Sequence, residues 1–283
     1  MTEPDVPAPP PPAHQRLTPR ERWTPVAVSI VSTVVVFGLA ALWITSSAHW
    51  PRLRDQFFSW SHIEESFPDV LQGFWINMRV WIISMILIML ISLLFAALRA
   101  LRGPWFAPFR VFAVLYIDLF RGIPAVLLML LFGLGIPALQ LPGVPDAALF
   151  WGTVALVVSY VAYTTEVYRS GIDAVHDSQR AAAKALGLTQ WQTLRHAILP
   201  QAVRNVVPAL LNLAVALQKD VALLSIIGVR DAVREARIFT ARTFNYSSLI
   251  AAAILFLIAS IPMARFADWV TRRDQERRLQ RTM

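Results

Sequence analysis

The chain of 283 residues is 56% hydrophobic and 16% charged, and its mean hydropathy is +0.53. Soluble domains carry about 25% charged residues, so the composition excludes an ordinary soluble protein, and the lack of cysteine excludes disulfides. The net charge of +8 is interpreted as the excess of Lys and Arg on the cytoplasmic segments of a membrane protein, not as a nucleic-acid-binding surface.

The N-terminal segment, residues 1–25, is rich in proline and poor in apolar residues, which is typical of a disordered cytoplasmic tail. Residues 26–48 follow, with an uncharged run over Val26–Thr45 that predicts an additional transmembrane helix. A signal peptide ending near Ala48 is the alternative. The run is longer than the core of about 7–15 residues in signal peptides, which favours an uncleaved anchor.

Further uncharged runs approach or exceed the length of about 18 residues that crosses a bilayer. They are Val80–Leu98, Gly122–Pro145, Ala147–Thr165 and Thr243–Ala264. A shorter run, Asn205–Gln218, continues as Val221–Val229 after a charged pair. Because backbone polar groups in lipid must be satisfied internally, the spans should be helices. The sequence therefore predicts an all-α membrane protein with about six transmembrane helices, one of them interrupted.

Basic residues gather in alternate connections: before the first span, after the second, after the fourth and after the sixth. This pattern places both termini in the cytoplasm of a multi-pass cell-membrane protein. Residues 46–70 are net acidic, as an outer loop can be. Residues 229–243 are basic although they should face outward, and their charges alternate at helical spacing from Arg230 to Arg237. We interpret this segment as an amphipathic helix with self-paired charges.

The connection between the fourth and fifth spans, residues 171–201, has local signals for two short helices. Ala181–Leu186 is made of helix formers, and Gly187 suits a left-handed C-terminal cap. Thr189 and Gln192 then form a capping box, and Pro200 should separate the second helix from the fifth span. One apolar face of the second helix is formed by Trp191, Leu194 and Ile198. The result is a cytoplasmic knob with a small-sided first helix.

This connection resembles the E-A-A-x(3)-G-x(9)-I-x-L-P signature of ABC importer permeases. Ala181 stands at the signature's glutamate and Ala197 at its isoleucine, while the remaining positions match. In that family the loop is a coupling helix that seats in a groove of a separate ATP-hydrolysing subunit. The resemblance implies that the ATPase-coupling loop contains Ala181, Ala182, Ala183, Gly187, Trp191, Leu199 and Pro200.

Four other segments resemble motifs of the polar amino-acid branch of these permeases. Leu119–Pro124 is similar to F-R-G-T-P and Thr165–Ile172 to A-E-x-x-R-G-G-I. Leu199–Arg204 is similar to L-P-Q-A-x-R and Leu217–Gly228 to L-x-K-D-T-S-L-x-S-x-I-G. The resemblance implies a type I ABC importer permease-like core over residues 70–270, with 271–283 as a basic cytoplasmic tail.

The same resemblance implies partners and a substrate class. The partners are an ABC ATPase dimer, a second permease that is this chain or another, and an extracytoplasmic amino-acid-binding protein. ATP and Mg²⁺ would bind the ATPase, and this chain would bind no cofactor or metal. The implied substrates are polar amino acids, with glutamate or another charged one favoured. The lipid bilayer is the surrounding partner, and no nucleic acid is expected.

Ionisable groups at membrane depth are costly and mark candidate functional positions. Asp118 and Arg121 lie early in the third span and share a helix face. They are interpreted as a gate, as a substrate contact or as a pair whose charges satisfy each other. Lys219 and Asp220 lie about 21 Å along the fifth span and point about 100° apart. A zwitterionic substrate could bridge them to other groups. The alternative is that Lys219 extends to the interface and Asp220 pairs with an outer-loop arginine.

Glu166, near the cytoplasmic end of the fourth span, is expected to pair with Arg169. Asn212 and Gln218 line a pathway or join helices, and both interpretations stay open. The candidate substrate pathway therefore comprises Asp118, Arg121, Glu166, Asn212, Gln218, Lys219 and Asp220.

The chain contains no phosphate-binding G-x(4)-G-K-[ST] motif, no H-E-x-x-H and no G-x-S-x-G. It is therefore predicted not to be an enzyme, with ATP hydrolysis on a separate subunit. One alternative, a stand-alone secondary transporter of a small polar solute, predicts an inverted repeat, and no convincing repeat is present. A pure scaffold is disfavoured by the intramembrane charges.

Overall fold

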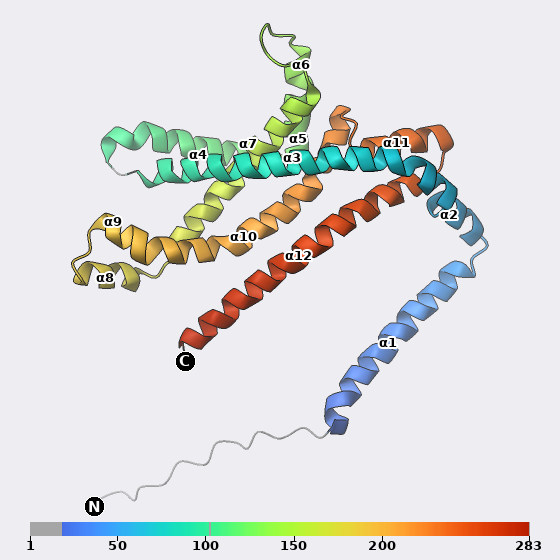
Figure 1. Ribbon diagram of the computed structural model, residues 1–283, viewed down its shortest axis with the longest axis horizontal. Helices are drawn as coiled ribbons and strands as arrows, with labels where there is room; N and C mark the ends of the chain where they lie inside the picture. Colours follow the sequence, from blue (N-terminus) through green and yellow to red (C-terminus); the bar gives the residue numbers. More distant parts are fainter. Residues whose placement is uncertain (1–18, 102, 283) are drawn as a thin grey trace, which may run out of the picture. The chain divides into compact units, whose positions relative to one another are not determined.

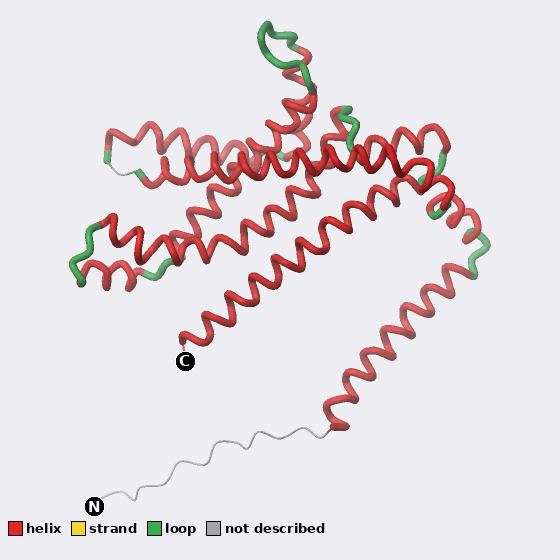
Figure 2. Tube along the Cα trace, viewed as in Figure 1, coloured by secondary structure: helices red, strands yellow, loops and turns green. Residues whose placement is uncertain are grey.

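The computed structural model describes residues 19–101 and 103–282, and every regular element within those ranges is a helix (Figures 1 and 2). The all-α prediction is therefore confirmed. In the described part of the chain, five helices are long and apolar enough to cross a membrane, and the number is six if a bent helix pair is counted as one span. The chain divides into two compact units, Met1–Arg54 and Asp55–Met283.

The first unit contains α1 (Pro19–Thr45), whose described side chains are exposed on almost every side. A helix that is apolar all round suits a lipid environment. It begins inside the predicted tail of residues 1–25. The prediction of disorder for residues 1–18 lies outside the described residues. The helix α2 (Trp50–Phe57) follows it and replaces part of the loop expected over residues 46–70.

The longest helix, α3 (Trp60–Ala100), extends the predicted second span by some five turns at its start. It contacts α7, α10, α11 and α12. Its buried stripe contains small and polar residues at intervals of three or four, among them Ser66, Gly73, Asn77, Ser84 and Ser92. Small side chains let neighbouring helices approach closely, so this stripe explains why α3 is the central contact of the second unit.

The third span is bent rather than straight. A 3₁₀ turn (Pro104–Phe106) leads into α4 (Ala107–Gly122), and after a break α5 (Ala125–Leu130), the π segment η2 (Leu131–Gly135) and α6 (Ile136–Ala138) follow. The two halves meet at 100°. The single helix expected over Gly122–Pro145 is therefore wrong. Pro124 holds Ile123 in an extended conformation, with φ −93° and ψ 128°.

The remaining core is formed by α7 (Ala148–Asp173), α10 (Leu199–Asp220), the 3₁₀ segment η4 (Val221–Ile227) and α12 (Ser247–Thr282). Leu217 and Leu224 are fully buried against Met129 and Leu156. The helix passes through Lys219 and Asp220 and only then tightens at Val221. The expected interruption of the fifth span is thus a change of helix type, and the segment 271–283 continues α12 through Thr282.

The basic segment after the fifth span forms α11 (Ala232–Thr243), which confirms the predicted helix. Arg230 binds Glu235 through two hydrogen bonds of 2.6 and 3.0 Å, so the charges are self-paired in part. Asp231 caps the helix by accepting the Arg234 amide at 2.8 Å. The apolar side of α11 packs on α3 and α12 through Ala232 and Ala236.

Candidate functional site

The predicted knob is present as α8 (Asp177–Ala185), α9 (Gln190–Gln192) and the π segment η3 (Thr193–Ile198). Gly187 has φ +73°, which confirms its left-handed cap. The Leu188 amide donates to the Ala183 carbonyl and the Gly187 amide to Lys184, the paired bonds of a Schellman motif. Thr189 and Gln192 form both hydrogen bonds of the capping box.

Pro200 does not separate the knob from the fifth span. The chain is continuously helical from Gln190 to Ile227, and the π segment η3 directly precedes Leu199 and Pro200. A π segment has wider turns than an α-helix, which leaves room for the proline ring. The wider turns also tolerate the loss of one backbone hydrogen bond, which proline cannot donate because it has no N–H. The knob is therefore rigidly continuous with α10.

The tip of the knob is apolar and exposed. Leu186 is 78% exposed and Trp191 66% exposed, on either side of Gly187. Most of the predicted coupling residues also lie at the surface, but Ala183 is only 3% exposed. Its methyl group packs inside the knob. One face of the knob is therefore packed inward, and the other is exposed.

The base of the knob is joined to two spans by a small apolar cluster of Val175, Ile198 and Ala202, with Ile172 beside it. Gly171 of α7 lies so close to α10 that a Cβ there would be 2.1 Å from a methyl carbon of Val206. The Asn205 side chain donates to the Gly171 carbonyl at 3.2 Å. A displacement of the knob would therefore move α7 and α10 together.

A charge cluster surrounds Glu166 at the end of α7 nearest the knob. Arg169 binds it at 2.8 Å, which confirms the predicted pair, and Arg99 of α3 binds its other oxygen. Arg121 of α4 approaches to 4.0 Å, and Arg169 also binds Asp173 at 2.8 Å. The sequence did not indicate Arg99 or Arg121 as partners, because both come from other helices. This cluster ties three helices together.

Asp118 and Arg121 do not pair with each other in the described structure. That alternative is wrong because Arg121 turns toward Glu166 and lies 5.8 Å from the ring centre of Tyr163. Asp118 is exposed on α4.

Asp220 accepts a hydrogen bond of 2.8 Å from the Tyr160 hydroxyl, and Lys219 beside it is exposed. The expected pairing of Asp220 with an outer-loop arginine is therefore wrong. The rings of Tyr160 and Tyr163 are 6.5 Å apart, so Asp220, Tyr160, Tyr163 and Arg121 form a continuous series, which we call the polar row. The sequence analysis missed the two tyrosines, because an uncharged tyrosine does not interrupt an apolar run and so gives no sign of a functional position.

The two amides of α10 that were predicted in the substrate pathway, Asn212 and Gln218, lie in different surroundings. Gln218 is completely buried and accepts a hydrogen bond from Ser260 of α12. Asn212 is exposed. Gln218 thus has the surroundings of a helix–helix contact, and Asn212 faces the open side of α10. Among the described residues no cluster of three or more His, Cys, Asp or Glu side chains could hold a metal ion.

A multi-span helical protein with a structured knob between two spans, and with charges aligned inside it, belongs to the class of membrane transport components. Residues 104–274, more than half of the chain, match the family described as "Binding-protein-dependent transport system inner membrane component". The chain belongs to this family, and the resemblance of its motifs to ABC importer permeases is confirmed.

Individual relatives agree. The chain is 32% identical over 222 residues to the glutamate/aspartate import permease protein GltK of Escherichia coli O6:H1, covering 76% of this chain and 98% of the relative. It is 32% identical to the arginine transport system permease protein ArtQ of Bacillus subtilis, covering 68% and 85%.

Two solved structures show the same fold. A crystal structure of an amino acid ABC transporter with histidines has a TM-score of 0.68 at 28% identity, covering 75% of this chain and 96% of that one. The methionine ABC transporter MetNI in an inward-facing conformation has a TM-score of 0.59 at 17% identity, covering 72% and 95%. The predicted permease fold is therefore confirmed.

Proposed function

We propose that this permease subunit imports polar amino acids, glutamate or another charged one in particular, using ATP hydrolysis on a separate subunit. The observation that carries the proposal is the knob: an exposed apolar tip on a base joined rigidly to α7 and α10. The names of GltK and ArtQ, which denote acidic and basic amino-acid transport, support a charged substrate without choosing its sign.

Coupling follows from the rigid base. An ATPase that grips Leu186 and Trp191 would move the knob, and the close contact of Gly171 with Val206 would carry α7 and α10 with it. These helices hold Glu166 and Asp220. In this mechanism nucleotide binding biases a two-state element between outward-facing and inward-facing forms.

The polar row suits an amino acid because it has opposite charges at its ends. Asp220 can attract an ammonium group and Arg121 a carboxylate, with two tyrosine rings between them. Charged groups inside a membrane protein mark substrate pathways. Lys219, Asn212 and Asp118 are exposed on α10 and α4 and complete the proposed pathway. Gln218 and Glu166 would support it from within.

The proposed assembly contains an ABC ATPase dimer with ATP and Mg²⁺ at the knob, a second permease, and an extracytoplasmic binding protein. Both termini are placed in the cytoplasm together with the knob, residues 1–25 as a cytoplasmic tail and residues 26–48 as an additional span. The absence of native cysteine makes this orientation testable, because single cysteines can be labelled from either side without background.

The decisive experiment measures capture of an ATPase. The full chain is co-expressed with candidate ABC ATPase subunits, purified in detergent, and compared with Gly187→Trp. Gly187 combines a left-handed φ of +73° with open space around it, so tryptophan there would both strain and obstruct the tip. Gly143→Trp is the matched control, since Gly143 has φ +78° and open space in the loop between α6 and α7.

The proposal requires that wild type and Gly143→Trp capture the ATPase and that Gly187→Trp does not. Capture by all three forms would exclude the knob as the coupling element. Capture by none would make a stand-alone secondary transporter the leading interpretation. Uptake of labelled glutamate, aspartate and arginine by the captured complex in vesicles then decides the substrate.

A further inference from the structure

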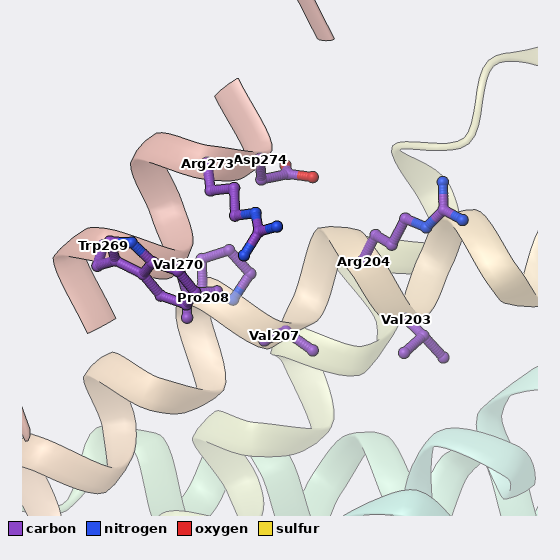
Figure 3. Close-up of a pocket in the computed structure, with 8 residues that line it drawn as sticks. All are labelled: Val203, Arg204, Val207, Pro208, Trp269, Val270, Arg273 and Asp274. Carbon is purple, nitrogen blue, oxygen red and sulfur yellow. The ribbon is translucent and has the colours of Figure 1, made fainter. Parts of the chain in front are cut away.

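A hollow of about 300 Å³ lies between the first turns of α10 and the far end of α12, away from the polar row. Arg204 comes from α10 and Arg273 from α12. Figure 3 shows Arg273 reaching over Pro208, while Arg204 stands on the opposite rim with its guanidinium directed away from Arg273. The guanidinium of Arg273 lies 5.1 Å from the ring centre of Trp269. The remaining lining side chains are Val203, Val207, Val270 and Asp274.

The position of the hollow along α12 matches a membrane surface. Trp269 follows Ser247, the first residue of α12, by a helical rise of about 33 Å, close to the hydrocarbon thickness of about 30 Å. Tryptophan and arginine are the side chains that gather at this level. The hollow therefore opens where lipid headgroups lie, whichever side of the membrane it faces.

The charge of the region is positive. Arg204 and Arg273 outnumber Asp274 in the hollow, and a second hollow of about 310 Å³ shares Trp269 and Arg273 and adds Arg272 and Glu276. Basic side chains at a membrane surface attract anionic lipids, each contributing roughly fivefold in affinity.

The surroundings of the hollow are apolar toward the bilayer. Val203, Ile261, Phe266 and Trp269 are each about half exposed, and the rings of Phe266 and Trp269 stack at 6.0 Å. A small soluble anion would leave these apolar surfaces exposed, whereas the acyl chains of a lipid would cover them. The combination of two arginines, an aromatic wall and exposed apolar flanks is that expected for an amphipathic anion.

We propose that this hollow binds the headgroup of an anionic phospholipid, with Arg273 on the phosphate, Arg204 turning in from the opposite rim to join it, and the acyl chains against α10 and α12. The site is independent of the proposed transport function, because it uses neither the knob nor the polar row. Lipid bound there would hold the base of α10 against α12.

The test uses the full chain assembled with its partner subunits in detergent, titrated with phosphatidylglycerol or with zwitterionic phosphatidylcholine and followed by native mass spectrometry. The double variant Arg204→Gln/Arg273→Gln should bind phosphatidylglycerol about 30-fold more weakly, since it loses two cations. Its binding of phosphatidylcholine should not change. The control Arg237→Gln/Arg265→Gln removes two exposed arginines outside the hollow and should bind as wild type does.

Arg273→Lys keeps the charge and should retain most of the binding, which separates loss of charge from loss of fold. Equal affinity of wild type and the glutamine double variant for phosphatidylglycerol would overturn the proposal, as would equal retention of the two lipids by wild type. Displacement of phosphatidylglycerol by inorganic phosphate would also overturn it, because the site would then be one for a soluble anion.

Discussion

Asn77 of α3 is completely buried, and its side chain makes hydrogen bonds to three groups of other elements. Its amide nitrogen donates to the Val221 carbonyl at 3.2 Å and to the Asp231 carboxylate at 3.1 Å, and its oxygen accepts from the Ala232 amide at 3.1 Å. It thereby fixes the end of the fifth span and the start of α11 against α3. The substitution Asn77→Ala would remove all three bonds at once.

The cost follows from the groups left behind. Each buried donor or acceptor that loses its partner costs about 1–3 kcal/mol. Three such groups, one of them a carboxylate, give a loss of about 4 kcal/mol in the free energy of unfolding. For a chain of this size that corresponds to a fall of roughly 7 °C in the unfolding temperature.

Intrinsic fluorescence of the ten tryptophans reports the unfolding temperature in detergent without a thiol dye. Asn212→Ala makes the same chemical change on the exposed side of α10 and should lower the temperature little. A fall of less than about 2 °C for Asn77→Ala, or an equal fall for Asn212→Ala, would refute the assignment of Asn77 as a structural junction.

Three further outcomes are expected. Burial raises the pKa of Asp231 to about 6 from 3.8, so folding favours the protonated carboxyl group. The contribution of Asp231 to the free energy of unfolding is therefore greatest below pH 4 and falls by about 3 kcal/mol as pH rises through 6. The difference in unfolding free energy between wild type and Asp231→Asn should decrease over that pH range. A difference that does not change with pH would contradict this prediction. Gly73→Ala would bring a Cβ within 2.5 Å of the Asp231 backbone and should cost about 1–3 kcal/mol, whereas Gly38→Ala, with open space around it, should be neutral or slightly stabilising. Glu166→Gln should cost about 1–2 kcal/mol, discounted for partial exposure, and a double-mutant cycle with Arg99→Gln should show coupling, whose absence would argue against the charge cluster.

Local features of the fold could be predicted because their causes lie within a few residues. The left-handed Gly187 and the Thr189–Gln192 capping box depend on neighbouring side chains and backbone, and both are present. The same holds for α11, whose charges alternate within the segment. In each case the partners that decide the structure are visible in one short stretch of sequence.

Features that depend on distant partners could not be predicted. The uncharged run placed the start of the second span at Val80, because Arg79 precedes it and Glu64, Glu65 and Asp69 lie further upstream. However, α3 begins at Trp60 and packs there on α11 and α12. Arg99 reaches Glu166 across 67 positions in sequence. The extended Ile123 follows from Pro124, but the bend of 100° is also set by where α5 packs, against α7 and η4.

The helix α10 connects the knob, the hollow and the polar row. Because it is one continuous helix, a movement at one of these sites is transmitted to the others. Its start adjoins the knob cluster at Ala202, Arg204 lines the hollow two residues later, and Asp220 ends it in the polar row. A helix of 22 residues spans about 33 Å. Since the knob continues into α10 without a break, a displacement at Trp191 would be delivered to Asp220 by one element rather than by a series of loops. A lipid that holds the base of α10 against α12 would resist that displacement, so occupancy of the hollow and the efficiency of coupling should change together.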